Sequence, residues 1–199
     1  MPSRVPDAID STICRIVNDI KLTRNIQDYV QKMKPIAVAL DRVQKSGTMI
    51  AEYVDIWHQL GTDLKNQPKA VLKEFNKRMA MAIGPHHYLA NMLDHRFQGK
   101  SLSDSQKSEA YEYLGSVNAD LIPFVLALQS GDGGGIFPKY LFRDTFLRVS
   151  PMTWWNVATQ SISMADENLQ TTARKQLLSV CSQLFTAVAS AAGLEHIFF

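Results

Sequence analysis

Hydrophobic residues recur every three or four positions along most of this chain, which is the spacing of a helix with one buried face. From Thr48 to Leu64 the opposite face carries acidic and amide side chains, so this segment predicts an amphipathic helix with an acidic outer stripe. A second segment of this kind follows Asn66-Gln67-Pro68 and runs to Ile83. We expect the two helices to lie antiparallel, with opposite charges near each other.

Two helices are expected before Thr48. The first covers Asp10 to Ile20, and a shorter one begins at Pro35, because proline is favoured in the first turn of a helix. The periodicity assigns inward positions to the apolar residues of these two segments, which are Ile13, Ile16, Val17, Ile20, Ile36, Leu40 and Val43.

A long helix is predicted after residue 102. Ser103 and Gln106 have the spacing of a capping box, which marks the first turn of a helix. Pro123 lacks a backbone N–H, so we expect this helix to kink or break at Ile122. The apolar positions on one face are Ala110, Leu114, Val117 and Leu121.

Glycine at four of the five positions 131–135 predicts the clearest loop in the chain. We therefore divide the sequence into a helical region over 1–130, a glycine-rich linker and connector over 131–149, and a C-terminal segment over 150–199. A short helix is expected between Ile136 and Val149, and another begins at Ser150-Pro151. The last helix covers about 165–185, with Leu169, Ala173, Leu177, Cys181 and Leu184 in line. No series of strands is predicted.

Composition narrows the class of protein. The chain has 199 residues, of which 46% are hydrophobic, as in an ordinary globular protein. Its 21 basic and 19 acidic side chains give a formal charge of only +2, which argues against an extended polybasic arm for nucleic acid. Cys14 and Cys181 suggest no disulfide framework, so a reducing compartment is the simpler expectation. No secretory signal or membrane span is predicted.

Histidines are the first candidates for metal ligands. His86 and His87 are adjacent, and His95 follows a few residues later, but no HExxH or CxxC pattern accompanies them. We therefore interpret all three as loop or surface histidines and predict no metal site. His58, on the helix that ends at Leu64, is interpreted as structural.

Two segments are candidates for phosphate binding. The glycine run 131–135 lacks the Lys-Ser or Lys-Thr of a phosphate loop, so a flexible loop is the favoured interpretation. The second segment is a basic stripe of lysines four residues apart, which has two interpretations: a contact for phosphate groups, or a helix face exposed to solvent. The solvent-exposed face is the favoured interpretation. This basic stripe consists of Lys69, Lys73 and Lys77, with Arg78 beside them.

Trp154 and Trp155 form an unusual pair. Adjacent residues on a helix point about 100° apart, so one indole can enter the core while the other packs against a neighbouring layer. The favoured interpretation is therefore core anchoring. The alternative is an aromatic platform at a partner interface.

Three segments, read in order, resemble one protein family. The first runs from Pro35 to Asp41 and on to Trp57. The second, Leu89 to Lys100, reads LANMLDHRFQGK, and the third is Pro151-Met152-Thr153-Trp154-Trp155 followed by Ala189 to Phe198. Together they resemble the C-terminal half of hAT-superfamily transposases and of host proteins derived from them, over roughly residues 34–199. Their order and spacing carry the resemblance.

This chain departs from the family pattern at three positions. The family typically has proline where His95 stands, arginine where His196 stands and serine where Phe199 stands. Two of these departures, His196 and Phe199, follow Glu195, which matches the family's glutamate by position.

The resemblance implies an RNase H-like core interrupted by a helical insertion, in which two aspartates and one glutamate hold Mg²⁺ or Mn²⁺ for phosphoryl transfer. The aspartates are expected upstream of Lys34, where only about thirty residues of helical pattern precede it. The expected fold is mostly α: an insertion-like helical bundle plus a C-terminal fragment of the RNase H-like core, with few or no strands. Glu195 alone cannot assemble a two-metal site, so we expect no enzyme activity and no cofactor.

The expected function is protein association, chiefly dimerisation, by a catalytically incomplete transposase-derived chain. The apolar run after Leu184 would bury poorly without the core sheet, which favours association. The expected interface residues are Trp154, Trp155, Leu194, Phe198 and Phe199. The alternatives are a nucleic-acid-binding module using the basic stripe, a transposase or nuclease completed by another chain, and an unrelated helical adaptor. The resemblance implies a nuclear location; otherwise the chain is expected in the cytoplasm, and it is not expected to be secreted.

Overall fold

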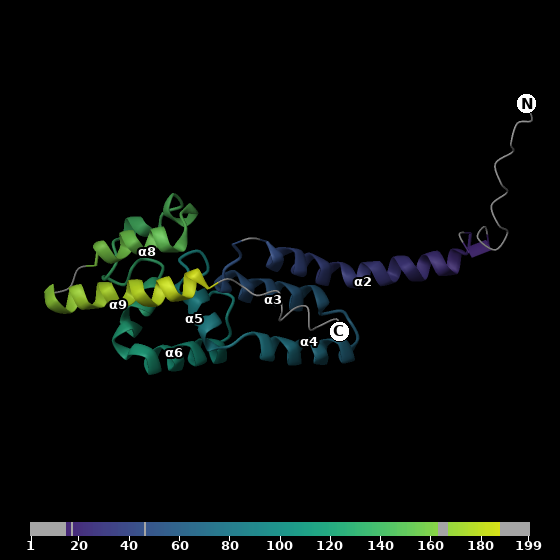
Figure 1. The fold of residues 1–199 in the computed structure, drawn as a ribbon, viewed down its shortest axis with the longest axis horizontal. Helices are drawn as coiled ribbons and strands as arrows, with labels where there is room; N and C mark the ends of the chain where they lie inside the picture. The colour runs from purple at the N-terminus through teal and green to yellow at the C-terminus, as the bar shows by residue number, and fades with distance from the viewer. Residues whose placement is uncertain (1–14, 17, 46, 163–166, 188–199) are drawn as a thin grey trace, which may run out of the picture.

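A computed structural model describes residues 15–16, 18–45, 47–162 and 167–187 (Figure 1). Helices make up most of these residues, and no β-strand occurs among them. The prediction of a mostly helical chain is therefore confirmed for this part, whereas its relation to an RNase H-like core stays a prediction. Within the same ranges, none of the helices combines the length and apolar content needed to cross a membrane.

The first long helix, α2 (Ile20–Gln44), corrects two predictions. It begins after Asp19, whose carboxylate accepts hydrogen bonds from the backbone N–H groups of Lys21 and Leu22. Pro35 lies inside α2 rather than at its start, because the residues before it already form helix from the Asp19 cap. Ile16 and Ile20 are 52% and 75% exposed, so the prediction that they point inward is wrong. Ile13 and Val17 lie outside the described residues.

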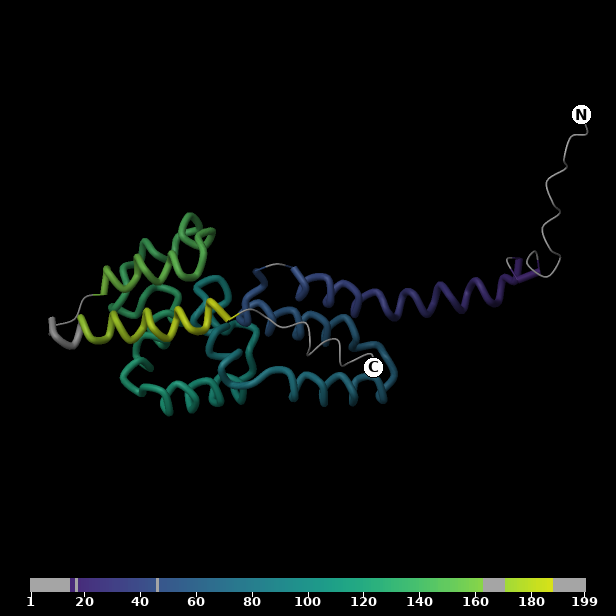
Figure 2. Tube along the Cα trace, in the orientation of Figure 1, coloured from purple at the N-terminus to yellow at the C-terminus, as the bar shows by residue number. Residues whose placement is uncertain are grey.

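Helices α3 (Ile50–Leu64) and α4 (Lys69–Ala82) follow as the predicted amphipathic pair. They run antiparallel, and α2 lies along the other side of α3 (Figures 1 and 2). Trp57 of α3 is fully buried and its indole lies 5.5 Å from the ring of Phe75, which joins the two helices. The N-terminal half of α2 extends past the ends of both helices (Figure 2).

Helix α5 (Pro85–Leu93) lies at the centre of the fold. It contacts α3, α6, α7 and α9, and the side chains from Tyr88 to Leu93 are all buried. A nine-residue helix enclosed on this many sides reads as a continuous apolar run rather than as an amphipathic stripe, which is why periodicity did not predict it. Its surroundings form one continuous hydrophobic cluster that also includes residues of α8 and α9.

The long helix predicted after residue 102 is confirmed at its start and divided at its end. In α6 (Asp104–Asn118) the Ser103 hydroxyl accepts from the Gln106 N–H, and the Gln106 side chain accepts from the Ser103 N–H. A 3-10 turn, η1 (Ala119–Leu121), then leads into α7 (Ile122–Gln129). This turn changes the helix direction before Pro123. Val117, in the last turn of α6, is 52% exposed, so its predicted inward position is wrong.

The glycine loop is present, and Gly131, Gly133, Gly134 and Gly135 all have positive φ angles. After it come two 3-10 helices, η2 (Lys139–Phe142) and η3 (Phe146–Arg148). Then follow α8 (Pro151–Gln160) and α9 (Glu167–Thr186), close to their predicted bounds. The connector over 131–149 packs against the rest of the fold, because Phe137 and Leu141 within it belong to the buried core. The predicted division into three regions stays a prediction.

Candidate functional site

Residues from the three family-like segments meet in the core. The indole N–H of Trp155 donates to the carbonyl oxygen of Leu93 at 2.8 Å, which joins α8 to the end of α5. The Asn91 amide donates to the carbonyl oxygen of Ala51 at 3.0 Å, which joins α5 to α3. Segments far apart in sequence therefore form one packed unit.

Trp154 and Trp155 are both fully buried. Trp154 donates its indole N–H to the carbonyl oxygen of Leu141 at 3.0 Å and stacks on the ring of His95. Because neither indole reaches the surface of the folded chain, the placement of these tryptophans at a partner interface is wrong. The core-anchoring interpretation is the one that the structure shows.

Asp94 and Arg96 form a charged clamp at the end of α5. Asp94 is fully buried, and its carboxylate accepts from Arg96 Nε at 2.9 Å and from Arg96 Nη2 at 2.6 Å. Arg96 also lies 3.0 Å from Glu52 of α3. Hydrogen bonding to Asp94 is the main factor that raises the pKa of Arg96, and Glu52 adds to it. This clamp therefore holds the α5 terminus against α3, and its charges are satisfied within the protein.

The turn after this clamp depends on a glycine. Gly99 has φ +65°, and a Cβ atom placed there would lie only 2.7 Å from Met92 Cγ. The Gly99 N–H donates to the carbonyl oxygen of Asn91, which closes the turn against α5. The glycine of the family-like segment thus has a steric role here.

The histidines near α5 lie deeper than the sequence predicted. His95 is 1% exposed, and its ring stacks on Trp154 at 5.3 Å between centroids. Burial lowers the pKa of His95, although neighbouring Asp94 opposes this. His87 Nδ1 accepts from the Gly84 N–H at 3.1 Å, and burial is the main factor that lowers the pKa of His87 to about 4. The surface interpretation is therefore wrong for His95, which is buried in the turn that follows α5. The loop interpretation is wrong for His87, which lies within α5 and is half-buried, whereas His86 is exposed as predicted.

The described residues contain no group of three or more His, Cys, Asp or Glu side chains arranged to hold a metal ion. Glu195 lies outside these residues, as do Leu194, Phe198 and Phe199. The predicted roles of all four therefore stay predictions.

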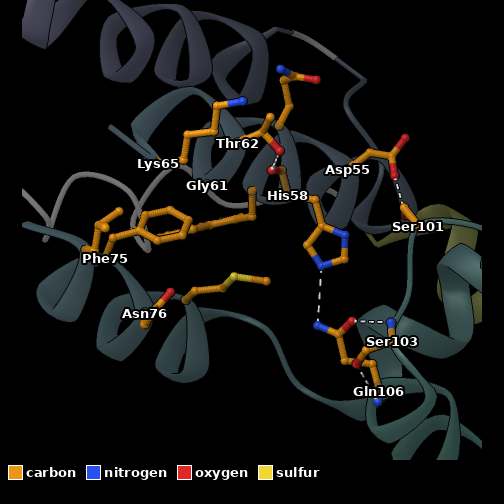
Figure 3. A pocket seen from close by; sticks show the side chains of 14 residues that line it. Asp55, His58, Gly61, Thr62, Lys65, Phe75, Asn76, Ser101, Ser103 and Gln106 are labelled. Atoms are coloured by element: carbon orange, nitrogen blue, oxygen red, sulfur yellow. Dashed lines mark hydrogen bonds between the residues drawn. The ribbon is translucent and has the colours of Figure 1, made fainter. Parts of the chain in front are cut away.

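A groove of about 850 Å³ lies between α3, α4 and the start of α6 (Figure 3). Its apolar lining includes Trp57, Leu72, Phe75 and Met79. Polar side chains gather at the end nearest α6, where they include Asp55, His58, Ser101, Ser103 and Gln106.

Hydrogen bonds within this groove explain its polar end. The Ser101 hydroxyl donates to Asp55 at 2.8 Å. Gln106 Nε2 lies 3.3 Å from His58 Nε2, and because an amide nitrogen only donates, His58 accepts here. Burial also lowers the pKa of His58. Ser101 is bonded to the carboxylate and not to the imidazole, so this cluster is no nucleophile–base pair. Sequence reasoning missed the groove, because the contact joins residues 48 positions apart.

The basic stripe lies on the outer side of α4. Lys69, Lys73 and Lys77 are exposed, whereas Phe75 on the opposite side is buried. Arg78 instead pairs with Glu74, with 2.7 Å between Nε and Oε1. The structure thus agrees with the favoured prediction of a solvated face and leaves three lysines accessible on one side of a helix.

The N-terminal half of α2 exposes several large apolar side chains. Ile26, Tyr29 and Val30 are 54%, 65% and 57% exposed. Leu22 lies on the same face and is 39% exposed. We call residues 20–34 of α2 the arm. It extends beyond the body, and no part of the described chain packs along its apolar face (Figure 1).

Comparison of the chain with family models, with curated proteins and with solved structures gave no match.

Proposed function

We propose that this chain is a protein-association module. The observation that carries the proposal is the arm, on which Ile26, Tyr29 and Val30 are each more than half exposed. Soluble proteins rarely leave a continuous apolar face of this kind uncovered, and such faces mark sites of association. The rest of the described chain forms one compact core that holds the arm out from its side (Figure 2).

We further propose that the module derives from a hAT-superfamily transposase and is catalytically incomplete. Support comes from the meeting of the family-like segments in the core, through Trp155 with Leu93 and Asn91 with Ala51. The contacts between these segments support the proposal, because segments that belong to one conserved fold are expected to pack together. On this proposal the protein acts in the nucleus, as its relatives would.

Association is tested with the full chain over a range of concentrations from low to high micromolar. Sedimentation equilibrium and light scattering give the molar mass at each concentration. The proposal expects a mass above that of one chain that rises with concentration. A mass equal to one chain throughout, with no other protein bound, would contradict it.

The absence of strand cleavage is tested separately. Purified protein is incubated with supercoiled DNA and Mg²⁺ or Mn²⁺, and the proposal expects no nicking beyond the rate of a Glu195→Ala variant. Nicking by the natural chain that the variant lacks would favour the alternative, in which carboxylates from another chain complete a three-carboxylate site.

DNA binding is the second candidate function. The observation that favours it is the accessibility of Lys69, Lys73 and Lys77 on one side of α4. Three charges on one helix would make a weak contact with phosphates, so this candidate is ranked below protein association.

A further inference from the structure

The apolar face of α2 follows a regular pattern that runs the whole length of the helix. Leu22, Ile26, Tyr29 and Met33 are separated by four, three and four residues, and Ile36, Leu40 and Val43 continue the same alternation. This is the spacing of the a and d positions of a coiled coil. The seam consists of these seven residues, with Leu22, Tyr29, Ile36 and Val43 at d positions.

The body covers only the C-terminal half of this seam. Val43 is 2% exposed, and Ile36 and Leu40 pack against the core where α2 contacts α3. Burial decreases toward the N-terminus, since Met33 is partly buried and Ile26 is 54% exposed. The same row of side chains that α3 covers in the body is therefore uncovered along the arm.

We propose that the arm pairs antiparallel with the arm of a second copy of this chain, with Ile26 of each facing Tyr29 of the other. This inference rests on the proposed association function and names its partner and geometry. In this register Leu22 of one chain faces Met33 of the other, so every layer joins an a position to a d position. Antiparallel two-stranded coiled coils are built from such mixed layers.

The overlap in this register ends where the body begins. Residue 20 of one arm faces residue 35 of the other, and beyond Pro35 the seam is already covered by the same chain's α3. The pairing is thus as long as the uncovered seam allows. A parallel pairing would instead direct the second helix into the position that α3 occupies, and it would bring two bodies to the same end.

The positions that flank the seam carry few charges. They are Thr23, Asn25, Val30 and Lys32. Lys32 is paired within its own helix, with its Nζ 2.6 Å from Asp28 Oδ2. In the antiparallel register Lys32 of one arm lies near Asn25 of the other, so no like charges face each other, and Val30 of each arm adds apolar area at the edge.

The size of the contact predicts a weak dimer. The arm spans about four helical turns, roughly 22 Å, from the rise of 1.5 Å per residue. Two such helices contribute four seam layers, which is at the small end of specific protein interfaces. Dissociation in the micromolar range is therefore expected.

Two variants of exposed apolar residues on α2 test the contact. Ile26→Glu places a charge within the seam, whereas Val38→Glu places the same charge at a site that is 50% exposed and lies off the seam. We expect Ile26→Glu to weaken self-association by at least roughly tenfold, from the loss of a central buried layer, and Val38→Glu to leave it unchanged. Circular dichroism establishes that both variants keep the helical fold. Equal effects from the two variants, or no effect from either, would overturn the proposal.

Cysteine cross-linking tests the register. In a Cys14→Ser background, a mixture of Ile26→Cys and Tyr29→Cys chains should form a mixed disulfide under mild oxidation. Each single variant alone should form much less, because Ile26 does not face Ile26 of the second copy. Cross-linking of Ile26→Cys to itself in preference to the mixture would indicate a parallel pair and contradict the proposal.

A lipid surface is the main competing occupant, since the side of the arm away from the seam carries Lys21 and Arg24, and Lys32 lies at the edge of the seam. Flotation with vesicles of anionic phospholipid distinguishes the two. Vesicle binding that Ile26→Glu abolishes, in a chain that stays monomeric at every concentration, would overturn both the antiparallel pair and the association function. Self-association that persists unchanged in Ile26→Glu would overturn only the pairing through the arm.

Discussion

The indole N–H of Trp155 donates to the backbone carbonyl oxygen of Leu93, 62 residues earlier in the chain. Leu93 is the last residue of α5, so no backbone N–H of that helix donates to its carbonyl oxygen. Both groups are buried, and Trp155 therefore serves as a side-chain cap for the central helix of the core. This contact ties the C-terminal part of the chain to α5.

Removing that donor should destabilise the fold. Trp155→Phe keeps an aromatic ring but leaves the Leu93 carbonyl without its partner, and the smaller ring leaves part of the site empty. We expect the free energy of unfolding to fall by about 2–4 kcal/mol. Urea denaturation followed by far-ultraviolet circular dichroism measures the change. An unchanged midpoint would show that water or another donor replaces the indole.

The Asp94–Arg96 clamp predicts a second loss of stability. Arg96→Met keeps much of the side-chain volume but leaves the fully buried Asp94 with only the backbone N–H of Arg96. We expect a loss of about 2–3 kcal/mol, reduced from the value for a fully buried pair because the Arg96 side chain is 30% exposed.

Glu52→Gln is the matched control for this clamp. It removes the charge at the more exposed end of the network, where the Glu52 side chain is 29% exposed, and should cost less than about 1 kcal/mol. If the two variants lose equal stability in the same urea titration, the buried Asp94 is not the source of the effect.

Helix periodicity predicted most of the fold correctly where one face of a helix meets solvent. It located α3 and α4, each of which has one buried and one exposed face. The start of α6 was located from its capping residues, because the hydrogen bonds between Ser103 and Gln106 are local. It missed α5, since a helix buried on several sides has no polar face to define a period. It also misplaced the start of α2, because the Asp19 cap outweighs the local preference of Pro35 for a first turn.

The candidate sites were harder to predict than the helices. The groove depends on His58 and Gln106, which belong to different helices, and no local pattern indicates that they meet. The tryptophan pair was recognised from the sequence, but its burial depends on Leu93 and Leu141, whose positions come from the tertiary packing. Spacing within one helix, by contrast, was enough to place the basic stripe.

His87 predicts a dependence of stability on pH. Its pKa is about 4 in the folded chain and about 6.5 when unfolded, so the unfolded chain takes up a proton first as the pH falls. This contribution to stability is complete above pH 6.5 and decreases down to about pH 4. Protonation also removes the Nδ1 lone pair that accepts from the Gly84 N–H. We expect a loss on the order of 1–2 kcal/mol over that range, after allowance for partial exposure.

The variant His87→Gln isolates this effect. Glutamine at the third helical position can also accept from the N-cap N–H, but it does not titrate. Stability measured by urea denaturation between pH 4 and pH 7 should change less steeply in this variant. His95 and His58 keep their own lowered pKa values, so some slope is expected to persist. An identical slope in both proteins would assign the dependence to other groups.

The basic stripe gives a prediction about DNA. Replacing Lys69, Lys73 and Lys77 with glutamine should leave thermal stability within about 0.5 kcal/mol, since all three side chains are exposed. Any affinity for duplex DNA should decrease, and the dependence of that affinity on salt should become less steep. Fluorescence anisotropy at several salt concentrations measures both. DNA affinity equal to that of the natural chain would exclude the stripe as the contact.

Cys181 is fully buried in α9, and burial raises the pKa of its thiol well above the ordinary value. Alkylating reagents react with the thiolate, so this side chain is protected twice, by access and by protonation. Its modification in a Cys14→Ser chain therefore requires the helices around α9 to separate. The rate of alkylation measured over hours would record how often the native core opens, and no residue has to be introduced into the core for this measurement.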